Sequence, residues 1–310
     1  MKSPASRSPS QLSDLHTASD SLTATIVICT CDRAAQLRAC LQAVSRLDPG
    51  PAEVLIIDNT SGDPATKAAA LDFGARYILE PIPGLSRARN RGLHECASSI
   101  AAFLDDDAEP APGWLAHLLE PFSDGSVASV TGDTWESLPA SAPSSARPTR
   151  FLGSSDPLWF ERANFGGLGF GTNMALRKAA CGGQPIFDER LGRGAPLWIA
   201  EESHAFTTLI VRGYRAAHVP PAIVIHPSKP RDIQREASTS FAYWLLLFFE
   251  FPAHRMDLLR FLARRLSGQK LPWPRDPQEP GEVLSSGWRV HVKAMLQGTR
   301  LYFRNRKRHR

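Results

Sequence analysis

The stretch SSIAAFLDDDAEP, residues 98–110, places three aspartates directly behind an apolar run. The run is short and is bounded by polar residues, which is typical of a buried strand. Aspartate is a poor strand former, and adjacent like charges repel one another, so we expect the acids to lie where the strand ends. One aspartate would suffice to end a strand. Three carboxylates predict either a cation held at this strand end or a solvated acidic turn that caps the next helix.

Three similar runs precede this stretch: TATIVICT (23–30), EVLIIDN (53–59) and ARYIL (75–79). Helical patterns lie between them. Asp32 is expected to cap a first helix, which has an apolar face made of Leu37, Leu41, Val44 and Leu47. A second helix should start at Pro64 and run to about residue 73. A third should cover residues 86–97. Strands that alternate with helices predict an α/β fold, a Rossmann-like, mostly parallel sheet with helices on both faces.

Polar side chains follow three of these strands where each strand ends: Cys31 and Asp32, Asp58 and Asn59, and Asp105 to Asp107. In parallel sheets, ligands bind outside the carboxyl ends of the strands, so these groups predict a binding site at one edge of the sheet. The chain has no Gly-x-Gly-x-x-Gly after a strand and no Gly-Lys-Ser/Thr loop. A dinucleotide-binding dehydrogenase and a P-loop enzyme are therefore poor fits.

The second half of the chain has a weaker pattern. In GGLGFGTNMALRK (166–178), glycines let the backbone approach a ligand, and a helix is expected to begin near Asn173. Residues 187–206 should pass from loop into a helix that starts around Ala200. The segment AAHVPPAIVIH (216–226) predicts a pair of strands that leads to His226, and the small, Pro-rich residues 139–148 predict a mobile loop.

Composition indicates a soluble globular protein of 310 residues, with 43% apolar and 22% charged residues and a net charge of +5. Five cysteines, an odd number, favour a reducing compartment, and Cys29 and Cys31 are interpreted as thiols on one face of a strand rather than metal ligands. No signal peptide is recognisable. The longest apolar run, 241–251, is too short to span a bilayer and contains Glu250. We expect a cytoplasmic protein.

We predict three regions: a disordered tail at 1–22, a main domain at 23–230, and a helical, basic extension at 231–310 with a Pro-rich linker at 268–287. Within the extension, residues 241–266 combine aromatic and aliphatic side chains with four arginines, Arg255, Arg260, Arg264 and Arg265. That composition suits peripheral contact with an anionic membrane, and it also suits helices that pack on the main domain or on a second subunit. The basic end, RNRKRHR, is not accompanied by a motif that recognises DNA or RNA, so nucleic acid is not expected as a partner.

Seven segments together carry a resemblance to a known family: VICTCDR, LIIDNTSGD, GLSRARNRGL, FLDDDAEPAPGW, GTNMALRK, ERLGRGAPLWIAEE and GYRAAHVPPAIVIH. In this order the chain resembles the family 2 glycosyltransferases over about two-thirds of its length. The resemblance implies the GT-A fold and inverting transfer of a sugar from a nucleotide-diphosphate donor.

The resemblance also implies roles for the acids. The family's Asp-x-Asp motif matches Asp105 and Asp107, so Asp107 is expected to bind Mg²⁺ or Mn²⁺ and Asp105 to contact the ribose, with Asp106 between them among the donor-binding residues. His226 matches a histidine that completes the metal site in some members, although a lone histidine is also commonly structural. These hard ions prefer oxygen ligands and stabilise a departing diphosphate.

The remaining donor contacts follow in the same way. Asp58 matches the acid that binds the nucleotide base, Thr30 and Cys31 lie where the first loop cradles it, and Arg89 matches a basic residue beside the nucleotide. Asn90 is expected to support a loop. Cys31 replaces a common aromatic residue, so either a pyrimidine or a guanine base is compatible with the sequence.

The expected catalytic base departs from the family pattern. Members usually carry Gly-Glu-Asp, whereas this chain has Ala200, Glu201 and Glu202. The resemblance implies that Glu202 is the base and that Glu201 is beside the substrate; on spacing alone both are acids that open a helix. Gly171, Thr172 and Asn173 are expected to border the sugar or acceptor. Trp198 either stacks on a sugar ring or packs in the core.

The expected reaction is a single displacement in which hexose or deoxyhexose passes to a hydroxyl of a glycan or lipid-linked acceptor, for example in cell-surface polysaccharide. Two other classes stay open. A glycoside hydrolase also uses paired carboxylates, but it needs no nucleotide or metal. A non-catalytic nucleotide-sugar or glycan-binding module would bind the donor and never release nucleotide diphosphate.

Overall fold

The structure is a computed structural model that describes residues 22–60, 62–137, 147–227, 232–267, 269 and 288–306. Three predicted segments lie outside these residues wholly or largely: the tail at 1–22 except Leu22, most of the loop at 139–148, and nearly all of the linker at 268–287. The last four residues of the basic end lie outside them as well.

The first half of the chain alternates strands and helices as predicted. Its elements are β1 (Ala24–Thr30), α1 (Ala34–Val44), β2 (Glu53–Asp58), α2 (Pro64–Asp72), β3 (Arg76–Leu79), α3 (Leu85–Glu95), β4 (Ile100–Asp105), β5 (Glu109–Pro110) and α4 (Trp114–Leu119). Pro64 stands at the first position of α2, where its missing N–H costs no helical bond. The side chain of Asp63 accepts hydrogen bonds from the backbone N–H groups of Ala65 and Thr66, which fixes the start of this helix.

The second half contributes further strands and the remaining helices. Its elements are a 3₁₀ turn (Glu120–Ser123), β6 (Val127–Trp135), β7 (Arg150–Leu152), α5 (Trp159–Asn164), β8 (Asn173–Arg177), a 3₁₀ turn (Lys178–Cys181), α6 (Glu201–Val211) and β9 (Arg215–Ile225). They are followed by α7 (Ile233–Glu250), a 3₁₀ turn (Pro252–His254), α8 (Arg255–Leu266) and α9 (Trp288–Arg306).

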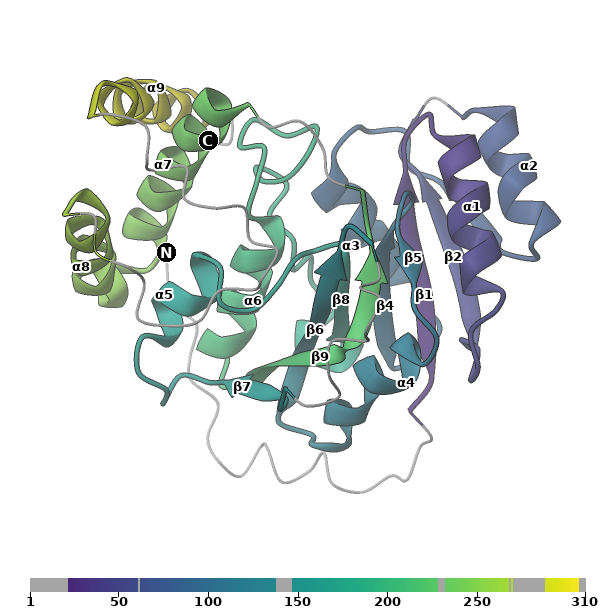
Figure 1. Ribbon diagram of the computed structural model, residues 1–310. Coiled ribbons are helices and arrows are strands. Elements are labelled where there is room, and N and C mark those ends of the chain that lie inside the picture. The colour runs from purple at the N-terminus through teal and green to yellow at the C-terminus, as the bar shows by residue number, and fades with distance from the viewer. Residues whose placement is uncertain are drawn as a thin grey trace.

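The described strands form one sheet in the order β3-β2-β1-β4-β8-β6-β9-β5, with β7 paired to β9 (Figure 1). Strands β1 to β4 are parallel to one another. Strand β8 is antiparallel to both β4 and β6, and β6 runs parallel to β9. The predicted α/β class is confirmed, and the antiparallel pairs are confined to the half of the sheet that follows β4 in space.

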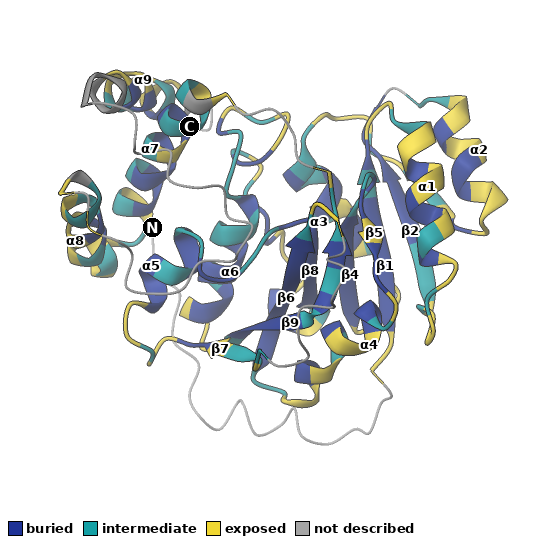
Figure 2. Cartoon of the chain, in the orientation of Figure 1, coloured by how far each residue is buried: buried dark blue, intermediate teal, exposed yellow. Residues whose placement is uncertain are grey.

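Helices cover both faces of the sheet because successive side chains of its strands point to opposite sides. One core contains Val27, Leu55 and Phe103 and packs against α3, α5 and α6. The other contains Ile26, Ile56 and helices α1 and α4. Figure 2 shows the central strands almost entirely buried between these helices, whose outer faces are exposed. The sheet is therefore buried on both faces, which explains why its strands are continuous apolar runs rather than alternating ones.

Three predictions about local structure are wrong. Asn173 begins strand β8 rather than a helix. Residues 215–225 form one strand, β9, rather than a pair, because the strand passes through Pro220 and Pro221 where its register with β6 shifts. Helix α1 is preceded by Arg33, without a side-chain cap, because Asp32 adopts a left-handed backbone conformation with φ of 55°.

The C-terminal helices continue the first of these cores. Ala242, Tyr243 and Leu247 of α7 are almost fully buried and belong to the same apolar cluster as Phe206 of α6. Helix α9 lies against α7 (Figure 1), where Gly298 permits close contact, because a Cβ atom there would come within 2.5 Å of the Ser238 carbonyl oxygen. Among the described residues, no helix combines the length and the apolar character needed to cross a bilayer. The domain boundary at residue 230 stays a prediction.

Candidate functional site

The carboxyl ends of three parallel strands meet at one edge of the sheet. The register pairs Thr30 of β1 with Asp58 of β2, and Cys29 of β1 with Asp105 of β4. Strand pairing therefore brings together groups that are far apart in the sequence, as we predicted for this edge.

Asp105, Asp107 and His226 form a cluster with the chemistry of a cation site. One possible ligand atom from each residue lies within 4.8 Å of the others. Nε2 of His226 is 3.1 Å from Oδ1 of Asp107 and 3.7 Å from Oδ2 of Asp105. This nitrogen is buried, and no described residue gives it a hydrogen bond of good geometry. Two carboxylates and an imidazole whose buried nitrogen faces them without a well-formed hydrogen bond fit a divalent ion such as Mn²⁺ or Mg²⁺.

Positive charge already lies against the other faces of these acids. Arg33 donates from Nη1 to Asp106 at 2.5 Å and from Nη2 to Asp107 at 2.8 Å. Asp106 also accepts a hydrogen bond from the hydroxyl of Thr30 at 2.7 Å, and it is nearly fully buried. Burial raises the pKa of Asp106 despite that hydrogen bond and the charge of Arg33. Asp106 therefore holds the turn together, while Asp105 and Asp107 face His226.

Arg89 is the central cation of the site. Its side chain is only 3% exposed and donates from Nη1 to Glu201 at 2.8 Å, and from Nη2 to the carbonyl of Gly171 at 3.0 Å. The same Nη2 is 3.5 Å from Oδ1 of Asp105. The resemblance implies that Arg89 lies beside the nucleotide. Its contacts place Arg89 behind Asp105, where it joins the cluster of Asp105, Asp107 and His226 to the start of α6.

The segment after Gly169 is built around this arginine. A Cβ atom on Gly171 would lie 2.8 Å from Nη1 of Arg89, so the glycine makes room for the guanidinium. Asn173 is fully buried and bonds to the Trp114 indole and to the carbonyls of Asp133 and Ala222. The side chain of Asn173 thus joins strands β6, β8 and β9 to α4. Its place beside a sugar stays a prediction. Thr172 is buried as well.

The expected catalytic base, Glu202, lies at the start of α6. Burial, and then the charge of Glu201, raise the pKa of Glu202 to about 8, although Arg89 opposes the shift. Ala200 precedes these acids with φ of 71°, a left-handed conformation that costs an L-residue about 1 kcal/mol or more. Glycine adopts this conformation freely, which gives a physical reason for the glycine that the motif usually has here.

Asp58 and Cys31, both predicted to contact the nucleotide, differ in their exposure to solvent. Asp58 is fully buried and accepts hydrogen bonds from the hydroxyls of Thr60 and Tyr77, at 2.8 and 2.7 Å. Cys31 is exposed at the end of β1, next to Asp32. Of this pair, only Cys31 presents its side chain to solvent, and base binding by Asp58 stays a prediction.

Asn90 supports a loop, as predicted. Its side-chain amide donates to the carbonyl of Phe187 at 2.8 Å, and its oxygen accepts from the backbone N–H groups of Ile186 and Phe187. The residues after Phe187 are thereby fastened to α3, the helix that carries Arg89.

A family profile described as "Glycosyl transferase family 2" matches residues 25–181, about half of the chain. The chain belongs to this family. Its matched region contains the strand-end acids, Arg89 and Gly171, whereas Glu202 and His226 lie beyond it.

Two curated glycosyltransferases match this chain over short regions. The chain is 34% identical over 116 residues to glycosyltransferase AglE of Haloferax volcanii, which is 35% of this chain and 38% of that protein. It is 35% identical over 112 residues to the pre-mycofactocin glycosyltransferase of Mycobacterium tuberculosis, which is 34% of this chain and 22% of that protein. The match thus spans well under half the length of either relative.

Solved structures share the fold over more of the chain. The mannosyltransferase PcManGT of Pyrobaculum calidifontis, in complex with GDP-Man and Mn²⁺, covers 94% of this chain and 79% of its own, with a TM-score of 0.53 and 17% identity. Glucosyl-3-phosphoglycerate synthase of Mycobacterium tuberculosis covers 76% of this chain and 83% of its own, with a TM-score of 0.51 and 20% identity. At these identities the likeness establishes the GT-A fold.

Among the arginines that have no predicted role, two contact predicted site residues of this family 2 chain. Arg33 binds two acids of the Asp105–Asp107 turn, and its sequence signal is its place three residues after the end of β1 at Thr30. Arg235 of α7 lies 3.7 Å from the ring centre of Trp198, and no sequence signal linked them because they are 37 positions apart. Trp198 is half-buried, with one contact to this guanidinium, and sugar stacking by its ring stays a prediction.

Proposed function

We propose that the protein is an inverting glycosyltransferase that moves a hexose or deoxyhexose from a nucleotide-diphosphate donor to an acceptor hydroxyl. One observation carries the proposal: Arg89 joins the Asp105, Asp107 and His226 cluster to Glu201, next to Glu202. A cation-type cluster and a carboxyl group of raised pKa therefore share one site. Family membership supports the same reaction class.

Asp105, Asp107 and His226 are the residues that would hold Mg²⁺ or Mn²⁺. When bound there, such an ion supplies charge neutralisation to a diphosphate leaving group. The structures of PcManGT with GDP-Man and Mn²⁺, and of glucosyl-3-phosphoglycerate synthase with Mn²⁺ and UDP-Glc at a TM-score of 0.50, support GDP- or UDP-sugars as the first donors to test.

In the proposed step, the acceptor hydroxyl oxygen forms a bond to the anomeric carbon while the bond from that carbon to the diphosphate oxygen breaks. Glu202 takes the hydroxyl proton, so it must be ionised before the step. Its raised pKa suits a general base that works near neutral pH. Because the displacement is single, the configuration at the anomeric carbon inverts.

Two substitutions separate the proposed roles. Asp107→Ala should abolish transfer and weaken Mn²⁺-dependent binding of nucleotide diphosphate, measured by calorimetry. Glu202→Gln should leave that binding intact and lower the transfer rate by about 10²- to 10⁴-fold, the usual contribution of a general base. A nearly full rate in Glu202→Gln would rule out the base assignment.

A donor panel tests the activity itself. Release of UDP, GDP or dTDP from sugar donors should require Mn²⁺ or Mg²⁺ and should stop in EDTA. Glu202 in place of the usual aspartate favours one alternative, a nucleotide-sugar-binding module. A binding module would bind the donor and release no nucleotide diphosphate with any acceptor. A glycoside hydrolase would act without nucleotide or metal.

For the acceptor side, we propose a glycan or lipid-linked substrate and peripheral contact with an anionic membrane. Five large apolar side chains of the C-terminal helices are 41 to 60% exposed: Phe249, Met256, Leu259, Leu296 and Phe303. Exposed arginines stand beside them, including Arg260, Arg300 and Arg304. Apolar side chains among basic ones match an anionic lipid surface.

Flotation of the full chain with vesicles tests the membrane contact. The protein should float with phosphatidylglycerol-rich vesicles and not with pure phosphatidylcholine. Met256→Gln combined with Leu259→Gln should weaken flotation, whereas Arg46→Glu in the exposed turn after α1 should not. Equal behaviour of all three proteins would contradict the proposed surface and leave the transfer activity untouched.

A further inference from the structure

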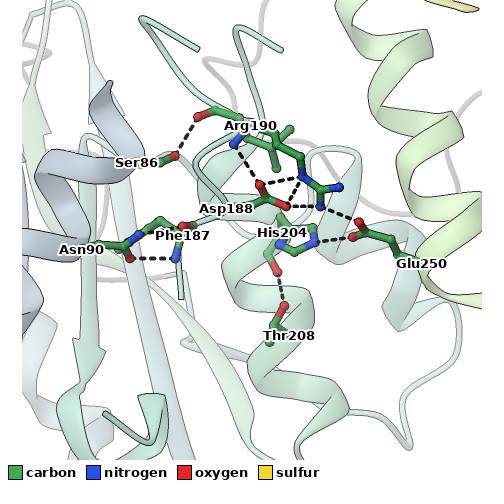
Figure 3. A network of polar contacts seen from close by, with 9 residues as sticks. Ser86, Asn90, Phe187, Asp188, Arg190, His204, Thr208 and Glu250 are labelled. Carbon is green, nitrogen blue, oxygen red and sulfur yellow. Dashed lines mark hydrogen bonds and ion pairs between the residues drawn. The ribbon is translucent and has the colours of Figure 1, made fainter. Parts of the chain in front are cut away.

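A second polar network lies outside the cation cluster and joins α6 to the C-terminal helix α7 (Figure 3). Arg190 donates from Nε to both carboxylate oxygens of Asp188 at 2.9 Å, and its Nη2 donates to Asp188 and to Glu250. The other carboxylate oxygen of Glu250 is 3.2 Å from Nε2 of His204. The four side chains thus form a chain from Asp188 through Arg190 and Glu250 to His204.

The network connects three parts of the molecule that carry the site. Asp188 and Arg190 lie in the loop that Asn90 of α3 fastens, and the hydroxyl of Ser86 donates to the Leu191 carbonyl of that loop at 2.7 Å. His204 is two residues after Glu202 in the first turn of α6. Glu250 is the last residue of α7. Any shift of α7 is therefore transmitted to the turn that holds the expected base.

The start of α6 has few other described polar restraints. Ala200 provides no side-chain cap, and the backbone N–H of His204 closes the first turn by donating to the Ala200 carbonyl at 3.0 Å. Arg89 fixes Glu201 from one side. Of the described side chains that follow Glu201 in this turn, the imidazole of His204 makes a polar contact with α7, through Glu250.

Arg190 pairs with both carboxylates of the network. Burial opposes ionisation of Asp188 and Glu250, but hydrogen bonds from Arg190 and His204, and their charges, hold the pKa of each carboxyl below its ordinary value. The ligand atoms of Asp188, His204 and Glu250 lie within 4.8 Å of one another, a spacing that would also suit a metal ion. Arg190 already binds both carboxylates, so a cation would have to displace it, and the observations favour an ion-pair network.

We propose that Glu250 and Arg190 are positioning residues that hold the first turn of α6, and with it Glu202, against the C-terminal helix. This inference rests on the proposed function of Glu202 as base. It makes α7 a working part of the catalytic unit, because a catalytic group must be held within a fraction of an ångström of its productive place.

The test compares Glu250→Gln with wild type in the full chain. The amide keeps the shape of the side chain and removes its charge. We expect kcat to fall about 10- to 100-fold, the effect of a misplaced catalytic group, with the donor KM within about twofold. The thermal midpoint should shift by less than about 4 °C, because partly exposed ion pairs contribute little stability.

Two further variants complete the experiment. Arg190→Gln should lower kcat by a similar factor, and the double variant should lose no more than either single one, since both break the same chain. Asp124→Asn is the matched control, because it removes a charge from the exposed Arg215–Asp124 ion pair, at 3.3 Å, away from α6. Its kcat should equal that of wild type.

A wild-type kcat in Glu250→Gln, or effects of the two substitutions that multiply, would overturn the inference. If Glu250→Gln does not fold, Arg190→Lys, which retains the charge but cannot bind both acids in the same way, must show the same selective loss of kcat. A wild-type protein that never releases nucleotide diphosphate would instead overturn the proposed function, so the two failures are distinguishable.

Discussion

Replacing Arg89 with methionine offers a direct measure of how the site is held together. The substitution keeps an unbranched apolar stem and removes the guanidinium that pairs with Glu201 at 2.8 Å. The side chain of Arg89 is 3% exposed and that of Glu201 is 9% exposed, so the remaining carboxylate would be buried without its cation. Removing one partner of such a pair costs about 3 to 5 kcal/mol.

The expected loss is large enough to measure. For a chain of this size, about 1 kcal/mol corresponds to roughly 2 to 4 °C, so Arg89→Met should lower the thermal midpoint by about 10 °C. Scanning fluorimetry in EDTA avoids any contribution from bound metal. Arg89→Met combined with Glu201→Gln removes the unpaired charge, so the double variant should be more stable than Arg89→Met alone.

The comparison of single and double variants decides whether the reasoning holds. If Arg89→Met changes the midpoint by less than about 2 °C, the pair is more solvated than its burial indicates. If the two single effects simply add, the residues do not interact, and the assignment of Arg89 as the central cation is wrong.

Three further predictions concern the base and the backbone. Burial and Glu201 raise the pKa of Glu202 to about 8, and a general base must be ionised to act. The transfer rate should therefore rise about tenfold per pH unit up to about pH 8 and then level off. A flat wild-type profile between about pH 6 and 8 would contradict this. Ala200→Gly should stabilise the protein by about 0.5 to 1 kcal/mol in urea unfolding, since it relieves a φ of 71°, and a loss of stability would show that the conformation is not strained. Gly92→Ala should destabilise it by about 1 to 3 kcal/mol, because the new Cβ would lie 2.4 Å from Cγ1 of Val27; unchanged urea unfolding would mean that α3 can move away from β1.

The first half of the fold was predictable because its signals are local. The apolar runs at 23–30 and 98–104 became β1 and β4, and Pro64 marked the start of α2. The strand-end acids also converged as predicted, because parallel pairing leaves no other place for them.

The errors came from positions where tertiary contacts override the local pattern. In β8, Met174 and Leu176 face one core while Ala175 faces the other, so the three middle positions are all apolar and the alternation of a strand is absent. Pro220 and Pro221 resembled a turn, yet a shift in register lets β9 continue through them. The contacts of Asn173 were also not predictable, and only the structure shows that three buried groups use its amide.

The arrangement of the two cores also bears on how the chain folds during synthesis. The core that packs on α1 and α4 uses side chains between Ala24 and Val224, so it is complete once β9 has left the ribosome. The opposite core includes Tyr243, Leu247 and Phe261 and must wait for α7 and α8. We therefore expect the nascent protein to close one side of its sheet first and to depend on chaperones, or on speed, to shield the other side until the last helices arrive.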